Sequence, residues 1–454
     1  MFEGEIWGAL VILISIGAVV ISITLSRWAN GRYLRPTISN WFMWCLFVYN
    51  YIGAVYLMLV RDSYEEAIGL FSYPEAIIGA WGLAVSGIIL IPLGMNLANA
   101  FWGISPNSIW QKFVFKSRVS TEVNTPRLFH IAFVFLAIIT LAVTLLYYQQ
   151  IDVPLLGVFR GEEAGNLALL RSEAIHGFEG KYYRYNFFKT TVLTILVLIS
   201  FFLRHNKAYR YAFWGLLGVR IIVCLAGLEK APIVNLFILL LLAWYFEKYN
   251  FNKRFFMFFC LAMIGIIISM YVWFMGTDIS NIDLFIFSIG AILRRVFVAQ
   301  GVGVDWSIVY VERYGFLNGA SLLNPAGMLP FSHVVYSVEL MEMVFPQNFL
   351  FMGQQGSMPT VFWGEVYANF GVWVTLFSMV VMGVVLRTGD ILFQTRKTNN
   401  NMLNKTLYVF MIKKFESYVG TSVLGIMFDQ DIWLTVIVVA FLSYLCRRDC
   451  RGVY

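Results

Sequence analysis

The stretch IWGALVILISIGAVVISITLSRWANGRYLRP (6–36) decides the fold. Its first part, 6–26, has no charged side chain and is long enough to cross the hydrocarbon core of a bilayer, which takes roughly 20 helical residues. Arg27, Arg32 and Arg35 follow directly. Because cytoplasmic loops are rich in Lys and Arg, this stretch predicts a membrane-spanning helix that begins outside the cytoplasm and ends inside it.

The rest of the chain repeats this pattern of apolar runs and charged gaps. The 454 residues are 59% hydrophobic and 13% charged, with a mean hydropathy of +0.73, whereas charged residues make up roughly 25% of a soluble domain. The apolar runs that we predict to span a membrane are 6–26, 39–60, 76–101, 129–149, 187–203, 211–226, 232–246, 256–275, 361–386, 406–428 and 432–446. We therefore expect an all-α, polytopic integral membrane protein with about 11 transmembrane helices, in which 1–454 form a single membrane domain.

Basic residues gather in every second gap and in the C-terminal tail. Twenty of the 33 fall there: Arg27, Arg32, Arg35, Lys112, Lys116, Arg118, Arg127, Arg204, Lys207, Arg210, Lys248, Lys253, Arg254, Arg387, Arg396, Lys397, Lys405, Arg447, Arg448 and Arg451. The acids in the same segments are Glu122, Glu247, Asp390 and Asp449. The positive-inside rule therefore predicts a cytoplasmic C-terminus and an N-terminus on the opposite side. The net charge of +7 is explained by these turns, so we do not expect nucleic acid as a partner.

Two exterior loops, about 150–186 and 276–360, are longer than a helix connection requires. Long loops in compact domains usually serve as lids or binding elements, so we expect these two to cover an active site. Within the second loop, LFIFSIGAILRRVFVA (284–299) could form a further span, but that would place the basic segment 387–405 outside. It is therefore predicted to be an interfacial or partly re-entrant helix.

The cationic candidates lie in the exterior segments. Arg171, in LLRSEA (169–174), is expected on a short helix, where it could equally be an exposed residue paired with Glu173 or Glu179. Lys230 stands in the tight GLEK turn (227–230), where a charge faces a cavity or a partner, or pairs with Glu229, or snorkels to the surface.

The paired Arg294 and Arg295 of the interfacial helix could bind a phosphate through bidentate hydrogen bonds, or could anchor the helix to lipid headgroups.

The segment SMPTVFWGEVYANFG (357–371) supplies the acid–base candidates. Glu365 and Asn369 are spaced i, i+4, and an ionisable group at a membrane-embedded helix start is a site candidate, although it could also cap the helix dipole. His333, in the preceding loop, is a second candidate. The four histidines are scattered and no phosphate-binding glycine motif occurs, so we expect no metal and no cofactor. The five cysteines lie in spans or in the tail, which predicts no disulfide.

The number of spans, LLRSEA after the fourth span, the G-x-x-K turn and the sequence 357–371 together resemble the O-antigen polymerases, the Wzy family. The resemblance covers most of the chain in architecture but its motifs are short. It implies a GT-C-like fold in the bacterial inner membrane with a periplasmic N-terminus. It also implies a glycosyltransferase that polymerises undecaprenyl-diphosphate-linked oligosaccharide repeat units into O-antigen or a related surface polysaccharide on the periplasmic face. The spacing of Arg171 from Gly177 and Gly180 departs from the arginine–glycine repeats proposed for some relatives.

This resemblance assigns an expected role to each candidate. The lipid diphosphate is the leaving group, and Arg171, Lys230, Arg294 and Arg295 are expected to bind it. Glu365, or else His333, is expected to act as the base for the acceptor hydroxyl. Arg160, Tyr367 and Asn369 are further candidates for contacts with the glycan. The same lipid-linked oligosaccharide serves as donor and acceptor, and a chain-length regulator and a flippase of the pathway are the expected partners.

Three other functions fit parts of the sequence. A flippase or other transporter of lipid-linked oligosaccharide would also need cations for the diphosphate, but internal repeats and small loops are more typical of transporters. An O-antigen ligase would share the donor and differ only in its acceptor. A membrane O-acyltransferase would need a histidine within a span, whereas His333 is in a loop.

Overall fold

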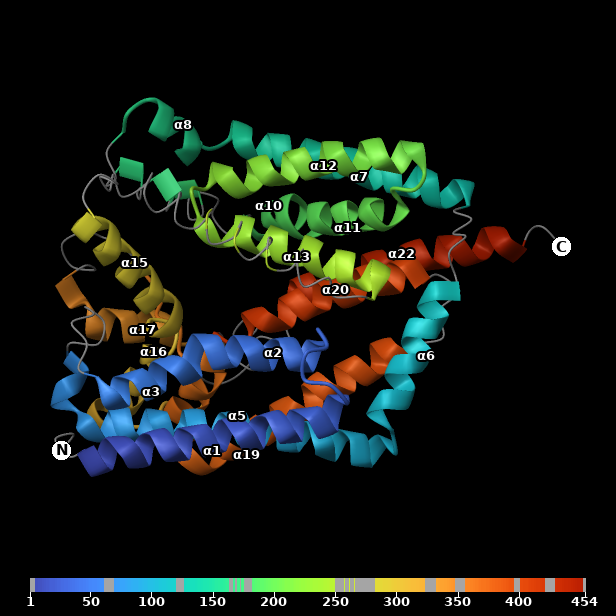
Figure 1. Cartoon of the computed structure of the whole chain (residues 1–454). Helices are drawn as coiled ribbons and strands as arrows, with labels where there is room; N and C mark the ends of the chain where they lie inside the picture. The colour runs from blue at the N-terminus through green and yellow to red at the C-terminus, as the bar shows by residue number, and fades with distance from the viewer. Residues whose placement is uncertain are drawn as a thin grey trace. The chain divides into compact units, whose positions relative to one another are not determined.

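The computed structural model describes residues 5–60, 69–119, 126–162, 166–167, 170–171, 173–174, 182–249, 257, 261, 265, 282–322, 332–347, 356–395, 401–420 and 429–451. All of the regular secondary structure in these residues is helical (Figure 1). The helices of the described residues include α1 (Glu5–Asn30), α2 (Ile38–Leu46), η1 (Phe47–Tyr51), α3 (Ile52–Leu59), η2 (Gly69–Ser72), α5 (Pro74–Trp102), α6 (Pro106–Val119), α7 (Arg127–Gln149), α8 (Pro154–Phe159), α10 (Tyr182–Asn186), η3 (Phe187–Val192), α11 (Leu193–Leu203), α12 (Lys207–Ala226), α13 (Lys230–Lys248), α15 (Ile282–Phe297), α16 (Val302–Tyr314), α17 (Tyr336–Val344), α19 (Val361–Thr395), α20 (Asn401–Ser417) and α22 (Gln430–Arg451).

Eight stretches of the described chain are long and apolar enough to cross a membrane. They are Ile6–Asn30, Ile38–Leu59, Pro74–Trp102, Arg127–Gln149, Tyr182–Leu203, Lys207–Ala226, Ala231–Lys248 and Val361–Thr395. Each coincides with a predicted span, which confirms a multi-pass, all-helical membrane protein.

The other three predicted spans are not among these eight stretches. Span 256–275 and the end of span 406–428 lie mostly outside the described residues, and 432–446 matches the shorter apolar helix Gln430–Cys446. The number eleven and the GT-C-like fold therefore stay predictions.

The chain divides into two compact units that are interleaved in sequence. Unit 1 comprises Met1–Phe113, Asp278–Thr395 and Lys414–Asp429, and unit 2 comprises Val114–Thr277, Arg396–Lys413 and Gln430–Tyr454. The expectation that 1–454 form one membrane domain stays a prediction.

Unit 1 is built around α5, which packs against α1, α3, α16 and α19 (Figure 1). The longest contact, between α5 and α19, depends on two glycines: a Cβ atom at Gly94 would lie 2.1 Å from the carbonyl oxygen of Val380, and one at Gly383 would lie 2.0 Å from that of Ile91. Small residues allow helix backbones to approach closely in a membrane, where apolar burial does not drive helices together.

At one end of unit 1, a buried polar network joins α1, α2, α5 and α19. The Arg387 guanidinium donates hydrogen bonds to the side-chain oxygens of Asn99 (2.7 Å) and Asn30 (2.8 Å). The Asp390 carboxylate accepts from the backbone N–H groups of Ile38 (2.8 Å) and Ser39 (3.1 Å), so it caps the start of α2. We expected Arg387 and Asp390 in a loop after span 361–386. The structure instead extends this helix to Thr395 and buries both side chains.

The long loop 276–360 of unit 1 contains three described helices, α15, α16 and α17. Helix α15 confirms the predicted helix at 284–299, and its last residue, Phe297, contacts Gly53 at the start of α3. Buried side chains of α16 and α17, among them Trp306 and Leu340, belong to the hydrophobic core that also contains Leu57 and Ile77. The described helices α16 and α17 of this loop are therefore packed into the core of unit 1.

Unit 2 has α11 at its centre, because nearly all the side chains from Leu193 to Leu203 are buried. Helices α7, α12 and α13 pack around α11, and α12 lies against it over the greatest length (Figure 1). The π-helix η3 continues directly into α11, and α22 packs on α7 and η3.

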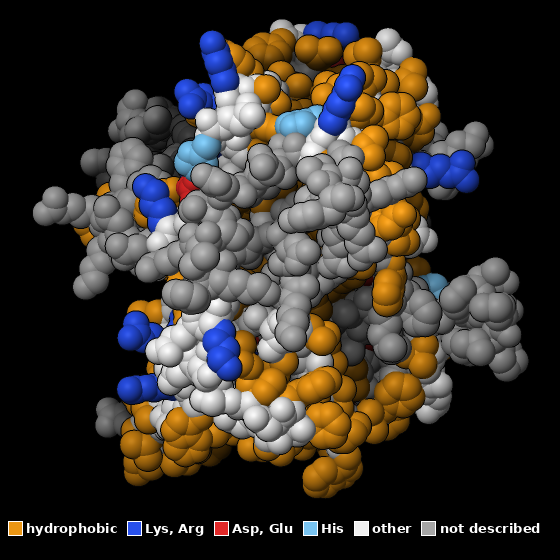
Figure 2. Space-filling view, turned by 90° about the vertical axis from the view of Figure 1, so that its right-hand side faces the viewer, with side chains coloured by type: hydrophobic (Ala, Val, Ile, Leu, Met, Phe, Trp, Pro, Cys, Tyr) orange, Lys and Arg blue, Asp and Glu red, His pale blue; other side chains and the backbone are white. Residues whose placement is uncertain are grey.

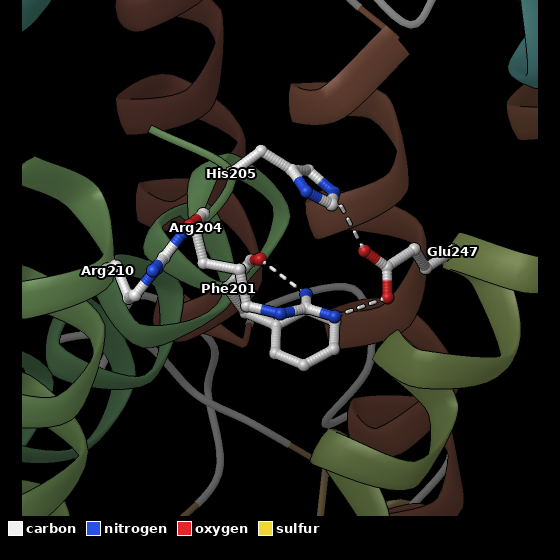
Figure 3. Close-up of polar contacts among 5 residues, drawn as sticks. All are labelled: Phe201, Arg204, His205, Arg210 and Glu247. Carbon is white, nitrogen blue, oxygen red and sulfur yellow. Dashed lines mark hydrogen bonds and ion pairs between the residues drawn. The ribbon is translucent and has the colours of Figure 1, made fainter. Parts of the chain in front are cut away.

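The ends of α11 and α13 are joined by a charged cluster (Figure 3). Glu247 accepts a hydrogen bond of 2.6 Å from Arg204 and lies 3.3 Å from His205 Nε2. Arg204 also donates to the carbonyl oxygen of Phe201 (2.7 Å), while its guanidinium lies over the Phe201 ring, and Arg210 donates to the Arg204 carbonyl oxygen. One of the few acids in the basic gaps thus pairs with an arginine of such a gap.

Basic side chains are prominent on the surface that Figure 2 shows, and acidic side chains are scarce among the described residues there. The excess agrees with the grouping of Lys and Arg in the sequence. Which side of a membrane this surface faces stays a prediction from the charge pattern.

Candidate functional site

A pocket of about 230 Å³ lies within unit 2, between the ends of α7, α12 and the start of α13. Its lining includes three basic side chains, Arg171, Lys189 and Arg220, and one carboxylate, that of Glu229. Its volume is below the roughly 300–1,000 Å³ typical of pockets that enclose a whole drug-sized ligand. The pocket therefore suits a compact headgroup, and the excess of cations favours an anionic one.

Lys189 lies in the π-helix η3 and its side chain is only 7% exposed. Its ammonium lies 3.6 Å from the ring centroid of Tyr147 and 5.0 Å from that of Tyr182. These ring faces stabilise the cation, by about 2 kcal/mol or more where it is desolvated. No carboxylate of the described chain forms an ion pair with Lys189. A buried lysine held in this way retains unused hydrogen-bond donors toward the pocket.

Arg220 is the second buried cation, 9% exposed on α12. Its Nε donates to the hydroxyl of Thr194 (3.1 Å), which in turn donates to the carbonyl oxygen of Thr190 (2.6 Å). Like Lys189, it has no ion-pair partner within the ranges that the structure describes. A buried charge without an ion pair has an unfavourable free energy of desolvation. A buried arginine that lines a pocket therefore indicates a site for an anion.

Arg171 reaches the same pocket from the loop 150–186. Its Nε donates to the carbonyl oxygen of Leu167 (3.3 Å), which is a helical i to i−4 contact, and the described residues around it, Leu170 and Ala174, are helical as predicted. It forms no ion pair with Glu173. Glu179, the alternative partner, lies outside the described residues.

The other two cationic candidates of unit 2 are less informative. Lys230 begins α13 next to the pocket, but its side chain lies outside the described part of the chain. Arg160 is exposed, lies 3.9 Å from Asp152 and is not part of the lining.

The remaining wall of the pocket is aromatic and polar. Tyr147 donates a hydrogen bond to the carbonyl oxygen of Ala174 (2.9 Å) and so fixes the loop 150–186 to the end of α7. Tyr148, Asn186, Thr190 and Asn235 also line the pocket, together with apolar side chains. Tyrosine rings beside cations can contact a sugar ring or an isoprenoid chain next to a phosphate. The arrangement can therefore hold a phosphorylated lipid headgroup.

Glu365 and Asn369 lie in unit 1, on one face of α19, as their spacing predicts. Glu365 accepts a hydrogen bond of 2.6 Å from Ser321, Asn369 donates to the same hydroxyl (2.8 Å), and the Asn369 side-chain oxygen accepts from the backbone N–H of Gly319 (2.9 Å). Both residues therefore fasten the segment 317–322 to the helix.

His333 lies beside the same segment, exposed, with Nδ1 3.0 Å from the carbonyl oxygen of Leu322. Between α16 and α17, Tyr310 donates a hydrogen bond to Glu339 (2.9 Å), and burial together with this hydrogen bond raises the pKa of Tyr310 to about 12. Tyr367 is half-buried on α19.

Arg294 and Arg295 are also in unit 1, at the end of α15, where Arg294 is half-buried and Arg295 is exposed. The predicted residues thus fall into two groups. Arg160, Arg171 and Lys230 belong to unit 2, and Arg294, Arg295, His333, Glu365, Tyr367 and Asn369 belong to unit 1. The catalytic roles assigned to them stay predictions.

The structure adds Lys189, Arg220 and Glu229 as site residues. Lys189 lies near the start of the fifth apolar span and Arg220 lies within the sixth. A charged side chain inside an apolar span is unfavourable in lipid, so its position alone marks each of them as a candidate site residue. That signal does not reveal that both face one pocket, because the π-helix at 187–192 changes the angle at which Lys189 projects.

The described residues contain no group of three or more His, Cys, Asp or Glu side chains that could hold a metal ion. Cys45, Cys224 and Cys446 are buried, and no disulfide joins them to one another. No protein-family model, no curated protein and no solved structure matches the chain. The resemblance to the O-antigen polymerases therefore depends on the sequence motifs described above.

Proposed function

We propose that this protein is a membrane glycosyltransferase of the O-antigen polymerase type, and that the pocket of unit 2 binds the diphosphate of its undecaprenyl-diphosphate-linked oligosaccharide substrate. The observation that supports the proposal most is that Lys189 and Arg220 are buried, line one pocket together with Arg171, and form no ion pair with a described residue. Buried cations that no described carboxylate approaches within ion-pair distance are suited to an anion that arrives with the substrate.

The chemistry of the reaction uses such a site directly. When the anomeric C–O bond of the donor breaks, negative charge develops on the diphosphate, and cations already in place stabilise that charge without reorganisation. The carrier is a lipid, so the diphosphate stays near the membrane surface. The ends of α7 and α12 are ends of candidate spans, which is the depth at which such a headgroup would be found.

The proposal is tested first by the surface polysaccharide of a strain that lacks the protein. Loss of the ladder of long chains on a gel, with survival of the band that carries core plus one repeat unit, would support a polymerase. Loss of the single-unit band as well would instead indicate a flippase or a ligase, since both are needed before any unit reaches the surface. An unchanged ladder would contradict all three.

The pocket is tested by complementing that strain with variants at matched expression. Lys189→Met, Arg220→Gln and Arg171→Ala should each shorten or remove the ladder. Lys207→Ala is the matched control, because Lys207 is an exposed cation at the other end of α12. Wild-type ladders from all three pocket variants would contradict the assignment of the pocket.

A further inference from the structure

A carboxylate lies at the edge of the cationic pocket. Glu229 lines the pocket, is exposed, and interacts electrostatically with Lys189, Tyr147 and Tyr182. It occupies the N-cap position of α13 but makes no capping hydrogen bond, and it forms no ion pair with any described residue. Its two oxygens are therefore available to accept a proton from a bound molecule.

Glu365, the base candidate of the sequence, is placed differently. Its carboxylate accepts the hydrogen bond from Ser321, and the side chain of Asn369 on the same helix face completes the attachment of segment 317–322. This geometry explains Glu365 as a structural contact. Within unit 2, by contrast, the lining of the pocket places a carboxylate beside the three cations.

We propose that Glu229 is the general base of the reaction. This inference rests on the proposed function, because it needs a sugar donor whose diphosphate occupies the cationic side of the pocket. The acceptor hydroxyl oxygen attacks the anomeric carbon and forms the new glycosidic bond. The old C–O bond breaks with its electron pair on the lipid diphosphate, and the hydroxyl proton moves to the Glu229 carboxylate.

The position of Glu229 suits both halves of that step. The positive charges of Lys189 and Arg220 oppose the charge on the leaving group, while the exposed carboxylate can release the accepted proton to water after each transfer. General base catalysis typically contributes 10²–10⁴-fold to a rate. Replacement of Glu229 should therefore reduce turnover without reducing the affinity for the diphosphate.

The experiment uses the purified full-length protein in nanodiscs, with lipid-linked repeat units extracted from a strain lacking the polymerase. Binding is measured separately with farnesyl diphosphate as the probe and farnesol as its uncharged control. Glu229→Gln should lower kcat by about 10²-fold or more and remove the acidic limb of the pH–rate profile. Its Kd for farnesyl diphosphate should be equal to that of the wild type or lower, because a negative charge has been removed. Glu173→Gln, an exposed carboxylate of the same unit outside the lining, should behave as wild type.

A second pair of variants separates a chemical role from a structural one. Glu229→Asp should keep part of the activity, and formate should restore part of the activity of Glu229→Ala by replacing the missing carboxylate. Activity of Glu229→Gln within threefold of wild type, or loss of the acidic limb in Glu365→Gln with its retention in Glu229→Gln, would overturn the inference. If wild-type protein forms no polymer or does not bind farnesyl diphosphate, the proposed function fails, and the inference fails with it. If the wild type does both, only the role of Glu229 is in question.

Discussion

At the scale of single residues, a buried charge with an unfavourable desolvation free energy indicates a functional site. Lys189 is a buried charge whose described neighbours include two tyrosine rings and no ion-pair partner. A buried charge without an ion pair costs desolvation free energy, and an apolar side chain of similar length in its place removes that cost. A site for an anionic ligand would need a lysine in this environment.

We expect Lys189→Met to separate binding from stability. A hydrogen bond from a charged donor contributes about 1.5–3 kcal/mol, so the Kd for farnesyl diphosphate should rise by about 10- to 100-fold. The midpoint of thermal unfolding in detergent should stay the same or increase. Lys207→Ala serves as the control for both measurements. A lower unfolding midpoint with unchanged Kd would show that Lys189 has a structural role only.

Asp305 presents the opposite case, a carboxyl group 2% exposed at the start of α16, outside the candidate spans. Burial raises its pKa well above the ordinary value, although its own backbone N–H acts in the opposite direction. The folded state therefore binds the proton more tightly than the unfolded state. Stability is retained below the pKa of the unfolded chain and decreases as the pH rises from there toward the pKa of the folded state.

We expect Asp305→Asn to raise the thermal midpoint at pH 7 and to weaken its dependence on pH. The increase should be smaller at pH 4 than at pH 7, because the unfolded chain loses most of the advantage of an ionised carboxyl group as the pH falls toward the ordinary pKa of that group. Unfolding scans from pH 4 to pH 8 test this, with Glu312→Gln, an exposed carboxylate of the same helix, as the control. A lower midpoint for Asp305→Asn at every pH would show that the ionised carboxylate stabilises the fold.

The helices themselves were largely predictable, because an apolar run of 20 residues bounded by charges has few other solutions in water or lipid. The predicted run 76–101, for example, lies within α5, Pro74–Trp102. The helix ends and the irregular turns were not predictable. The π-helices η1 and η3 have no sequence signal. Helix α19 continues past Arg387 because Asn30 and Asn99 accept hydrogen bonds from its guanidinium. These partners lie some 290 to 360 positions away in sequence, so only the folded structure brings them together.

The contact between α5 and α19 provides a matched pair of glycines on one helix. Gly94→Ala would place a methyl group 2.1 Å from the Val380 carbonyl oxygen, whereas a methyl group at Gly82 meets nothing within 4 Å. Forced overpacking costs about 1–3 kcal/mol, while alanine in an open helix position gains up to about 1 kcal/mol over glycine. We expect Gly94→Ala to lower the thermal midpoint and Gly82→Ala to keep or raise it. Equal midpoints would show that the two helices can separate without cost.

At the scale of the whole molecule, the sequence predicts sidedness and the structure tests only whether the segments are helical. The site depends on both, since a pocket for a lipid diphosphate must face the side on which the substrate is presented. The charge pattern places the loops 150–186 and 276–360 on the side opposite to the basic gaps.

The side of the membrane on which the C-terminal part of the chain lies depends on whether α15 crosses the membrane. If α15 is interfacial, Thr395 at the end of α19 lies in the cytoplasm together with Leu34 and Asn206, and Tyr314 lies outside; if α15 crosses the membrane, Thr395 lies outside. These four positions are exposed, and a single cysteine can be placed at each of them. In cells whose outer membrane has been permeabilised, a membrane-impermeant maleimide should label only Tyr314→Cys. The cysteines at the other three positions should be labelled only after the cells are lysed. The described native cysteines are buried and give the unlabelled background, with Cys260 and Cys450 replaced by serine. Labelling of Thr395→Cys before lysis would contradict the interfacial assignment of α15, because the positive charges of 387–405 would then lie on the wrong side for the rule that predicts every other turn.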